Sequence, residues 1–283
     1  MSAPLYAELP APPPLDALVH CFWFLRGSLM GAPSQPVLPD GRMEIVLHLA
    51  EPFAEVGTDG VARGQAEVLL AGQLMAPISL MPQGPADVIG IRFRTEAARS
   101  IMGFSALAAT GRVEGLAAFH ARLAGALQGA MAQWRKGATG SGKGAMAQKR
   151  NEETVATLSA VLREFVRDEP SPMVREAVRA LARPDGVPLR ELAGKLGVTL
   201  RTLERRVTAD TGLGPKPLQR VLRFRSALRL LERTPRGRWS GAAIRAGYYD
   251  QAHMIREFRS FAGMPPSEYF GAEVPLSRAI QGL

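Results

Sequence analysis

The most informative segment of this 283-residue chain reads Leu189-Arg-Glu-Leu-Ala-Gly-Lys-Leu-Gly-Val-Thr-Leu-Arg-Thr-Leu-Glu-Arg-Arg-Val207. Apolar residues recur at helical spacing from Leu189 to Leu196, which predicts a short helix with one buried face. Gly197 supplies the backbone freedom that a tight turn needs. Thr199 is then a suitable N-cap for a second helix. The segment therefore predicts a helix-turn-helix unit.

A second segment repeats this organisation, and it reads Ala242-Ala-Ile-Arg-Ala-Gly-Tyr-Tyr-Asp-Gln-Ala-His-Met-Ile-Arg-Glu-Phe258. Gly247 marks the break and Asp250 is a suitable N-cap. Between the two units, a helix is expected to begin near Pro215, a residue type that the first turn of a helix tolerates. Two units on one spacer helix predict a tandem helix-turn-helix domain.

The outer face of each second helix carries side chains that read base edges in a major groove. Arg201 and Arg205 suit guanine, and Glu204 suits cytosine or a neighbouring arginine. Gln251 suits adenine and Arg256 suits guanine. A solvated helix face is the alternative interpretation of Arg201, Glu204 and Arg205.

Charge divides the chain into two parts. Residues 1–135 hold 9 Arg, no Lys and 11 Asp or Glu, a net charge of −2. Residues 136–283 hold 26 Lys or Arg and 15 Asp or Glu, a net charge of +11. The basic excess therefore lies with the helix-turn-helix pattern, where it favours a nucleic-acid partner.

The first 135 residues predict short strands separated by turns. Met43–Leu49 reads as one strand, and Val88–Arg94 alternates between apolar residues and arginine. Within the first of these, Glu44 and His48 fall on the same face. With Arg42 they are the expected lining of a pocket for a polar effector. The scattered histidines and the single cysteine predict neither a metal site nor a disulfide.

We expect an α+β protein, with a small β-barrel-like N-terminal domain carrying added helices and an all-α C-terminal domain. The expected organisation is a sensor or dimerisation domain (1–135), a flexible linker (136–150), a connecting helix (151–172), the DNA-binding domain (173–272) and a tail (273–283). A signal peptide and a membrane span are not expected, and the expected location is the cytoplasm.

The C-terminal half resembles the AraC/XylS-type transcription regulators. The resemblance rests on residues 192–206, on Thr-Gly-Leu-Gly-Pro-Lys at 211–216, on Arg-Phe-Arg at 223–225 and on residues 246–259. It implies base-reading positions at Arg201, Glu204, Arg205, Gln251, Ala252, His253 and Arg256. The expected phosphate contacts are Thr199, Thr202, Arg206, Lys216, Arg220 and Arg259.

The N-terminal half more loosely resembles the sensor domains attached to one subgroup of these regulators. This likeness rests on Cys21-Phe-Trp-Phe, on Val37-Leu-Pro-Asp-Gly-Arg-Met-Glu-Ile-Val46, on Ala71-Gly-Gln73 and on Gly90-Ile-Arg-Phe-Arg94. It implies small β-barrels whose ligands are mostly unassigned.

We therefore expect a sequence-specific regulator that binds double-stranded DNA with two recognition helices in successive major grooves. A small-molecule effector, a second copy of the chain and, for an activator, RNA polymerase are the further expected partners. No cofactor and no enzymatic activity are expected. The alternatives are a non-specific architectural DNA-binding protein and a barrel enzyme fused to a DNA-targeting module. The sequence shows no evident nucleophile–base pair for the enzyme alternative.

Overall fold

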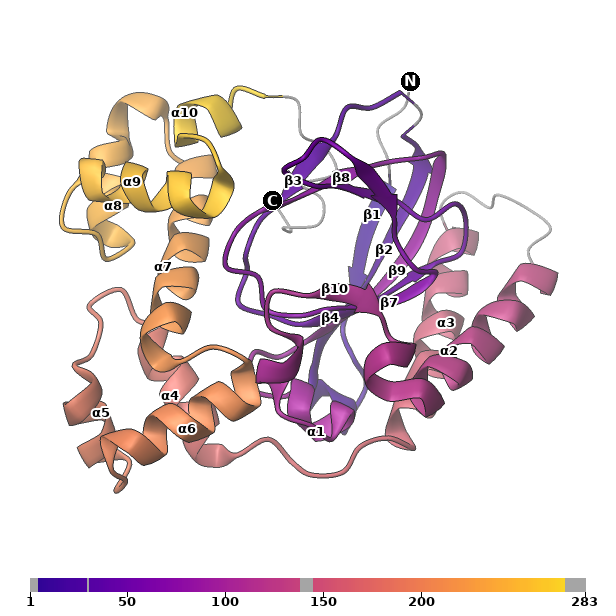
Figure 1. Cartoon of the computed structure of the whole chain (residues 1–283), viewed down its shortest axis with the longest axis horizontal. Coiled ribbons are helices and arrows are strands. Elements are labelled where there is room, and N and C mark those ends of the chain that lie inside the picture. Colours follow the sequence, from indigo (N-terminus) through magenta and orange to yellow (C-terminus); the bar gives the residue numbers. More distant parts are fainter. Residues whose placement is uncertain (1–4, 30, 138–144, 273–283) are drawn as a thin grey trace.

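The structure is a computed structural model that describes residues 5–29, 31–137 and 145–272. The centre of the expected linker (138–144) and the expected tail (273–283) lie outside these residues. The described part holds a sheet domain, followed in the chain by a helical domain (Figure 1).

Two antiparallel sheets make up the sheet domain, and neither closes on itself among the described strands. The larger has the order β1 (Leu5–Leu9), β2 (Val19–Ser28), β9 (Pro85–Phe93), β4 (Glu44–His48), β7 (Val68–Ala71) and β10 (Val113–Gly115). The smaller has the order β3 (Gln35–Val37), β8 (Ile78–Met81), β5 (Ala54–Val56) and β6 (Ala62–Gly64). The expected fold class is confirmed, with two open sheets in place of a closed barrel.

The period-two alternation of β4 and β9 gives the larger sheet two buried faces. Ile45 of β4 pairs in register with Ile91 of β9, and both lie in the main core of the domain. Glu44 pairs with Arg92 and faces the opposite way, toward the smaller sheet. One face therefore builds the core, and the other lines the space between the two sheets.

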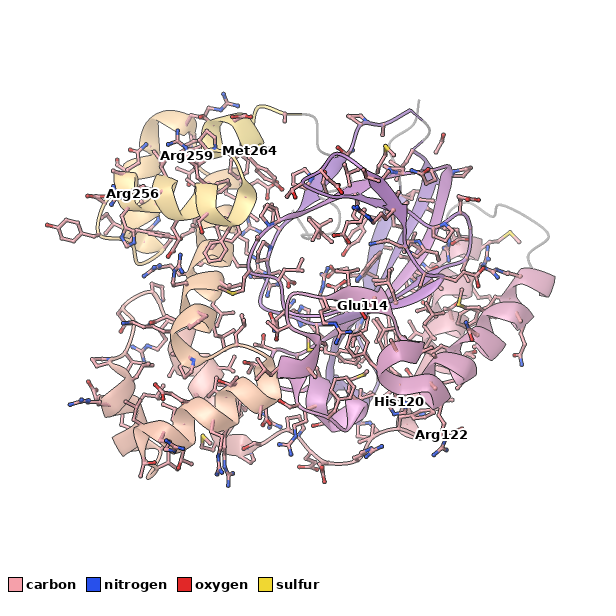
Figure 2. All side chains as sticks on the ribbon, in the orientation of Figure 1. Glu114, His120, Arg122, Arg256, Arg259 and Met264 are labelled. Carbon is pink, nitrogen blue, oxygen red and sulfur yellow. The ribbon has the colours of Figure 1, made fainter. Side chains whose placement is uncertain are left out.

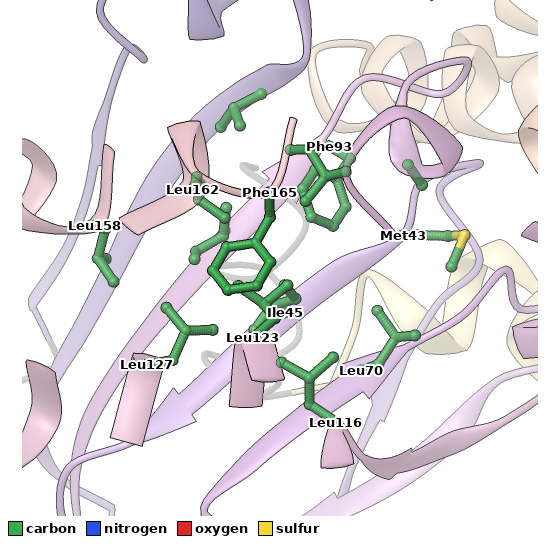
Figure 3. Close-up of a cluster of buried hydrophobic side chains, with 14 of the residues drawn as sticks. Met43, Ile45, Leu70, Phe93, Leu116, Leu123, Leu127, Leu158, Leu162 and Phe165 are labelled. Atoms are coloured by element: carbon green, nitrogen blue, oxygen red, sulfur yellow. The ribbon is translucent and has the colours of Figure 1, made fainter. Parts of the chain in front are cut away.

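Helices cover the core face of the larger sheet. They are α1 (Ala98–Met102), α2 (Ala117–Gly137) and α3 (Ala145–Arg163), with the 3-10 turns η1 (Leu15–Ala17) and η2 (Ala106–Ala109). Leu123 and Leu127 of α2 pack with Leu158 and Leu162 of α3 in the same apolar cluster as the strands (Figure 3). Helix α3 is thus part of the packed structure of the sheet domain.

The helical domain has a single core. Its helices are α4 (Pro172–Leu181), α5 (Leu189–Lys195), α6 (Leu200–Thr211), α7 (Pro215–Glu232), α8 (Trp239–Arg245), α9 (Gln251–Ala262) and α10 (Pro266–Tyr269), with the turn η3 (Arg236–Arg238). Phe224 of α7 lies 5.2 Å from Phe258 and 5.0 Å from Phe261 of α9, between ring centroids. Trp239 and Tyr269 are buried in this core.

The two domains are in direct contact at the C-terminal end of α6. Arg99 of α1 donates to Asp210 at 3.0 Å, and Thr110 after η2 donates its hydroxyl proton to the carbonyl oxygen of Gly212 at 2.8 Å. Leu38 of the sheet domain is buried in the core of the helical domain. The sheet domain therefore holds one end of a helix that belongs to the first helix-turn-helix unit.

Gly90 gives a test of the packing between the sheets. A methyl group at this position would lie 1.8 Å from Cε2 of Trp23, whose indole N–H donates to Glu44 at 2.9 Å. We expect Gly90→Ala to lower the free energy of unfolding by about 2–3 kcal/mol, because the ring has to move. Chemical denaturation measures this change.

Gly125→Ala is the matched control. Gly125 is exposed in α2 and has no neighbour within 4 Å of an added methyl group. Alanine there should raise stability by about 0.5–1 kcal/mol, because it restricts the unfolded chain. A Gly90→Ala protein as stable as the parent would contradict the packing described above.

Candidate nucleic-acid interface

The first helix-turn-helix unit consists of α5 and α6. Gly197 in the turn between them has φ +66°, a value that L side chains rarely adopt. Thr199 caps α6 by accepting a hydrogen bond from the N–H of Thr202 at 3.1 Å. Such a cap stabilises a helix by about 1 kcal/mol. The N-terminus predicted for this helix is confirmed.

The expected contact residues of α6 lie on its outer face. Leu203 and Val207 are buried in the core of the domain. Thr202 is partly buried. The other expected contact residues of this unit are exposed: Thr199, Arg201, Glu204, Arg205 and Arg206. The structure thus places two faces on this helix, one apolar and packed, the other mainly basic and open to a ligand.

The second unit consists of α8 and α9 and follows the same design. Asp250 caps α9 by accepting from the N–H of His253 at 2.6 Å. Ala252, Arg256 and Arg259 are exposed, while Gln251 and His253 are partly buried. Figure 2 shows Arg256 and Arg259 on the helical domain, away from Glu114 and His120 of the sheet domain.

Two ion pairs fix α9 against α7. Arg220 donates to Glu257 at 2.9 Å and Arg223 donates to it at 2.8 Å, and the Glu257 side chain is only 5% exposed. Burial alone raises the pKa of Glu257, but hydrogen bonds from Arg223 and Arg220 bring this pKa below its ordinary value. Arg220, an expected phosphate contact, thus has a structural partner, although 45% of its side chain remains exposed. Lys216 is exposed near the start of α7.

Tyr249 was not anticipated from the sequence. Its side chain is 87% exposed, immediately before the cap of α9, and Ile244 of α8 is also exposed. The signal was available in the sequence, because Tyr248 and Tyr249 are adjacent in the turn and one N-capped helix start can bury only one of them. Tyr248 is the buried member, in edge contact with His253.

The three residues expected to form an effector pocket do line one cavity. Arg42, Glu44 and His48 lie around a space of about 70 Å³ between the two sheets. Apolar side chains complete its wall; they include Val37, Val46, Phe53, Leu69, Ile78, Leu80 and Val88. The cavity is therefore mainly apolar, with its charged groups gathered around Arg42 and Glu44.

Some polar side chains in the cavity wall have ion-pair partners, and others have no hydrogen-bond partner. Buried Arg92 forms an ion pair with Glu44 and another with Glu8 at 3.1 Å. In contrast, the ring nitrogens of His48 are buried and make no hydrogen bond that meets the usual limits of distance and angle. Burial lowers the pKa of His48 to about 4, although Gln65 beside it favours the charged form. At neutral pH the cavity wall therefore carries a neutral imidazole at one end of β4 and a paired carboxylate at the other.

The described ranges hold neither a candidate metal cluster nor a candidate membrane-spanning helix. No three His, Cys, Asp or Glu side chains there come close enough together to hold a metal ion. None of the helices in those ranges combines the length and the apolar character needed to span a bilayer.

Comparison with known families agrees with the two-domain division. Residues 192–272 match the family described as "Helix-turn-helix domain", whose members are of the AraC type. The C-terminal domain is an AraC-type helix-turn-helix domain. Residues 7–114 match the family described as "Domain of unknown function (DUF6597)". The chain thus joins an AraC-type helix-turn-helix domain to a sheet domain that matches a family of unknown function.

Three solved structures are similar to the chain. The C-terminal domain of AraT, a response regulator from Geobacillus stearothermophilus, is 26% identical, with 37% of this chain and 88% of that chain covered and a TM-score of 0.33. ToxT from Vibrio cholerae is 10% identical, with 95% of this chain and 98% of that chain covered and a TM-score of 0.45. ToxT of strain SCE256 bound to an unsaturated fatty acid is 11% identical, with 95% of each chain covered and a TM-score of 0.43. No curated protein sequence matches the chain.

Glu257→Gln tests the tie between α7 and α9. We expect the free energy of unfolding to fall by about 2 kcal/mol, because charge-assisted hydrogen bonds to a buried carboxylate are lost. The folded-state pKa of Glu257 is lowered, so its contribution is complete above the ordinary pKa of 4.5 and is lost as the pH falls below it. The stability difference between parent and variant should therefore shrink in acid.

Glu232→Gln is the control, since Glu232 is exposed at the end of α7. Denaturant titrations at pH 7 and at pH 3.5 compare the three proteins. A Glu257→Gln protein whose deficit is the same at both pH values would refute the assignment of a charged, hydrogen-bonded carboxylate.

Proposed function

We propose that the protein reads a specific DNA sequence with α6 and α9 placed in successive major grooves. The observation that carries this proposal is the matched geometry of the two helices. Each is N-capped, packs its apolar face on α7 and leaves arginine on its outer face. The first turns of such helices meet base edges.

The length of α7 supports the two-groove arrangement. Its 18 residues span about 27 Å. The two helix-turn-helix units pack toward its opposite ends (Figure 1), so their separation is comparable with the helical repeat of DNA, about 34 Å. Positive charge favours the same partner, because exposed arginines on both units attract phosphate.

A signal sensed by the sheet domain is proposed to alter how α6 is presented to DNA. The argument rests on the contacts of Arg99 and Thr110 with the last turn of α6. An effector that favours one docked arrangement over another shifts the population of DNA-binding conformations. The cavity that contains Arg42, Glu44 and His48 is the proposed effector site. Its lining suits a small molecule with an apolar body and a polar end.

Selection of bound sequences from random duplex DNA tests the reading of base pairs. At about 150 mM salt, we expect the parent protein to select a motif with two conserved blocks about one helical turn apart. Arg201→Ala should lose discrimination in one block and Arg256→Ala in the other, by about 1–3 kcal/mol at the affected positions.

Lys149→Ala serves as the control, since it removes an exposed positive charge from α3 of the sheet domain. It should leave the motif intact. A parent protein that selects no motif, with both arginine variants weakened equally on every sequence, would instead identify an architectural DNA-binding protein.

The role of the domain contact is tested by releasing it in the full-length chain. We expect the Arg99→Ala/Thr110→Val double variant to bind the selected DNA at least about fivefold more weakly than the parent, because α6 loses a restraint. Arg112→Ala is the control, since Arg112 pairs with Glu114 on the surface of the sheet domain. Fluorescence anisotropy measures both affinities, and equal affinities for parent and double variant would rule out coupling through this contact.

A further inference from the structure

A second, strongly basic cleft lies between the two domains, apart from the apolar cavity. Its volume is about 480 Å³, within the range of small-ligand pockets. The sheet domain contributes Asp16, Arg42, Arg94 and Glu96, and the helical domain contributes Arg175, Arg179 and Arg225. Five arginines thus face two carboxylates across one domain boundary.

Two guanidinium groups of this cleft, those of Arg42 and Arg225, have Asp40 nearby but lack hydrogen bonds among the described residues. Arg42 Nε and Nη1 are buried without a hydrogen-bond partner. Among the described residues, no hydrogen bond and no ion pair within 4 Å involves the side chain of Arg225. The buried donors of Arg42 cost free energy while they are unsatisfied, so a ligand that accepts from them regains that energy.

Other groups on the walls are only partly occupied. Arg94 donates through Nε to the main-chain oxygen of Asp16 at 2.6 Å, and Arg175 donates to the oxygen of Pro170 at 3.5 Å. Arg179 pairs with Glu176 at 3.7 Å, with both side chains exposed. Each of these arginines therefore keeps further N–H groups for a ligand.

The electrostatic environment agrees with an uncompensated positive cluster. Burial, with repulsion from Arg42 and Arg229, lowers the pKa of Arg225 to about 9 despite attraction by Asp40. Burial and the nearby Arg42 and Arg225 similarly lower the pKa of His20 to about 4. These arginines repel one another across the cleft.

We propose that this cleft binds a small multivalent anion of the phosphate or polycarboxylate class, held between Arg42 of the sheet domain and Arg175 and Arg225 of the helical domain. Guanidinium groups match both oxyanions with paired hydrogen bonds. The volume admits a compact anion and is too small for a DNA duplex. Because the ligand bridges both domains, it stabilises their docked arrangement. This inference is independent of the proposed reading of DNA.

Calorimetry and thermal unfolding of the full-length protein test the site, with inorganic pyrophosphate and citrate as separate probes at constant ionic strength. We expect at least one probe to bind and to raise Tm. Arg225→Gln and Arg175→Gln, on two different helices, should each weaken that binding at least tenfold. Arg233→Gln should not, because Arg233 is exposed at the end of α7 and does not line the cleft. Binding of pyrophosphate alone assigns the phosphate class, and binding of citrate alone the carboxylate class.

The protein without anion provides a second readout. Arg225→Gln should keep or raise Tm there, since it removes one of several charges that repel one another. A merely structural role for Arg225 would lower Tm in the absence of anion and leave anion affinity unchanged. That result, the absence of binding by both probes, or an equal loss of affinity in Arg233→Gln would each overturn the proposal.

Discussion

The burial of α7 is the constraint on which the rest of the structure depends. Leu218, Val221 and Phe224 of this helix lie in the core that both helix-turn-helix units share. On another side, the sheet domain approaches so closely that a methyl group on Gly41 would be 3.2 Å from Leu222. A single helix therefore relates α6 and α9 to each other and to the sheet domain. Any change in its packing affects all three.

Much of the helical domain could be predicted because its signals are local. The caps at Thr199 and Asp250, the turn at Gly197 and the start of α7 at Pro215 each depend on a few adjacent residues. The strand face shared by Glu44 and His48 was predictable for the same reason, since the side chains of a strand alternate.

The features that could not be predicted depend on residues far apart in the chain. Nothing near Glu257 in the sequence indicates that Arg220 and Arg223 are its partners, 37 and 34 positions away. The contact between Arg99 and Asp210 spans 111 positions. Nothing near Arg225 in the sequence indicates that Arg42 of the other domain lies close to it. Such pairings follow from the arrangement of the helices within a domain and of the two domains in space.

The two regions that the sheet domain borders share a wall. Arg42 borders both the apolar cavity between the sheets and the basic cleft between the domains. Asp40, on the same loop, lies at the edge of the cavity and attracts both Arg42 and Arg225. A displacement of this loop alters the shape of one region and the charge balance of the other.

The sheet domain contacts α6 at its C-terminal end, so a rotation of the whole helical domain about this contact moves the two ends of α6 by different amounts. Asp210 lies at the contact, whereas Arg201 lies nine residues away at the other end of the helix, about 13 Å along the helix axis. A rotation of about 10° about this contact displaces Arg201 by about 2 Å, enough to break the proposed hydrogen bond to a base edge. A rotation too small to disturb the core of either domain is therefore large at the N-terminal end of α6.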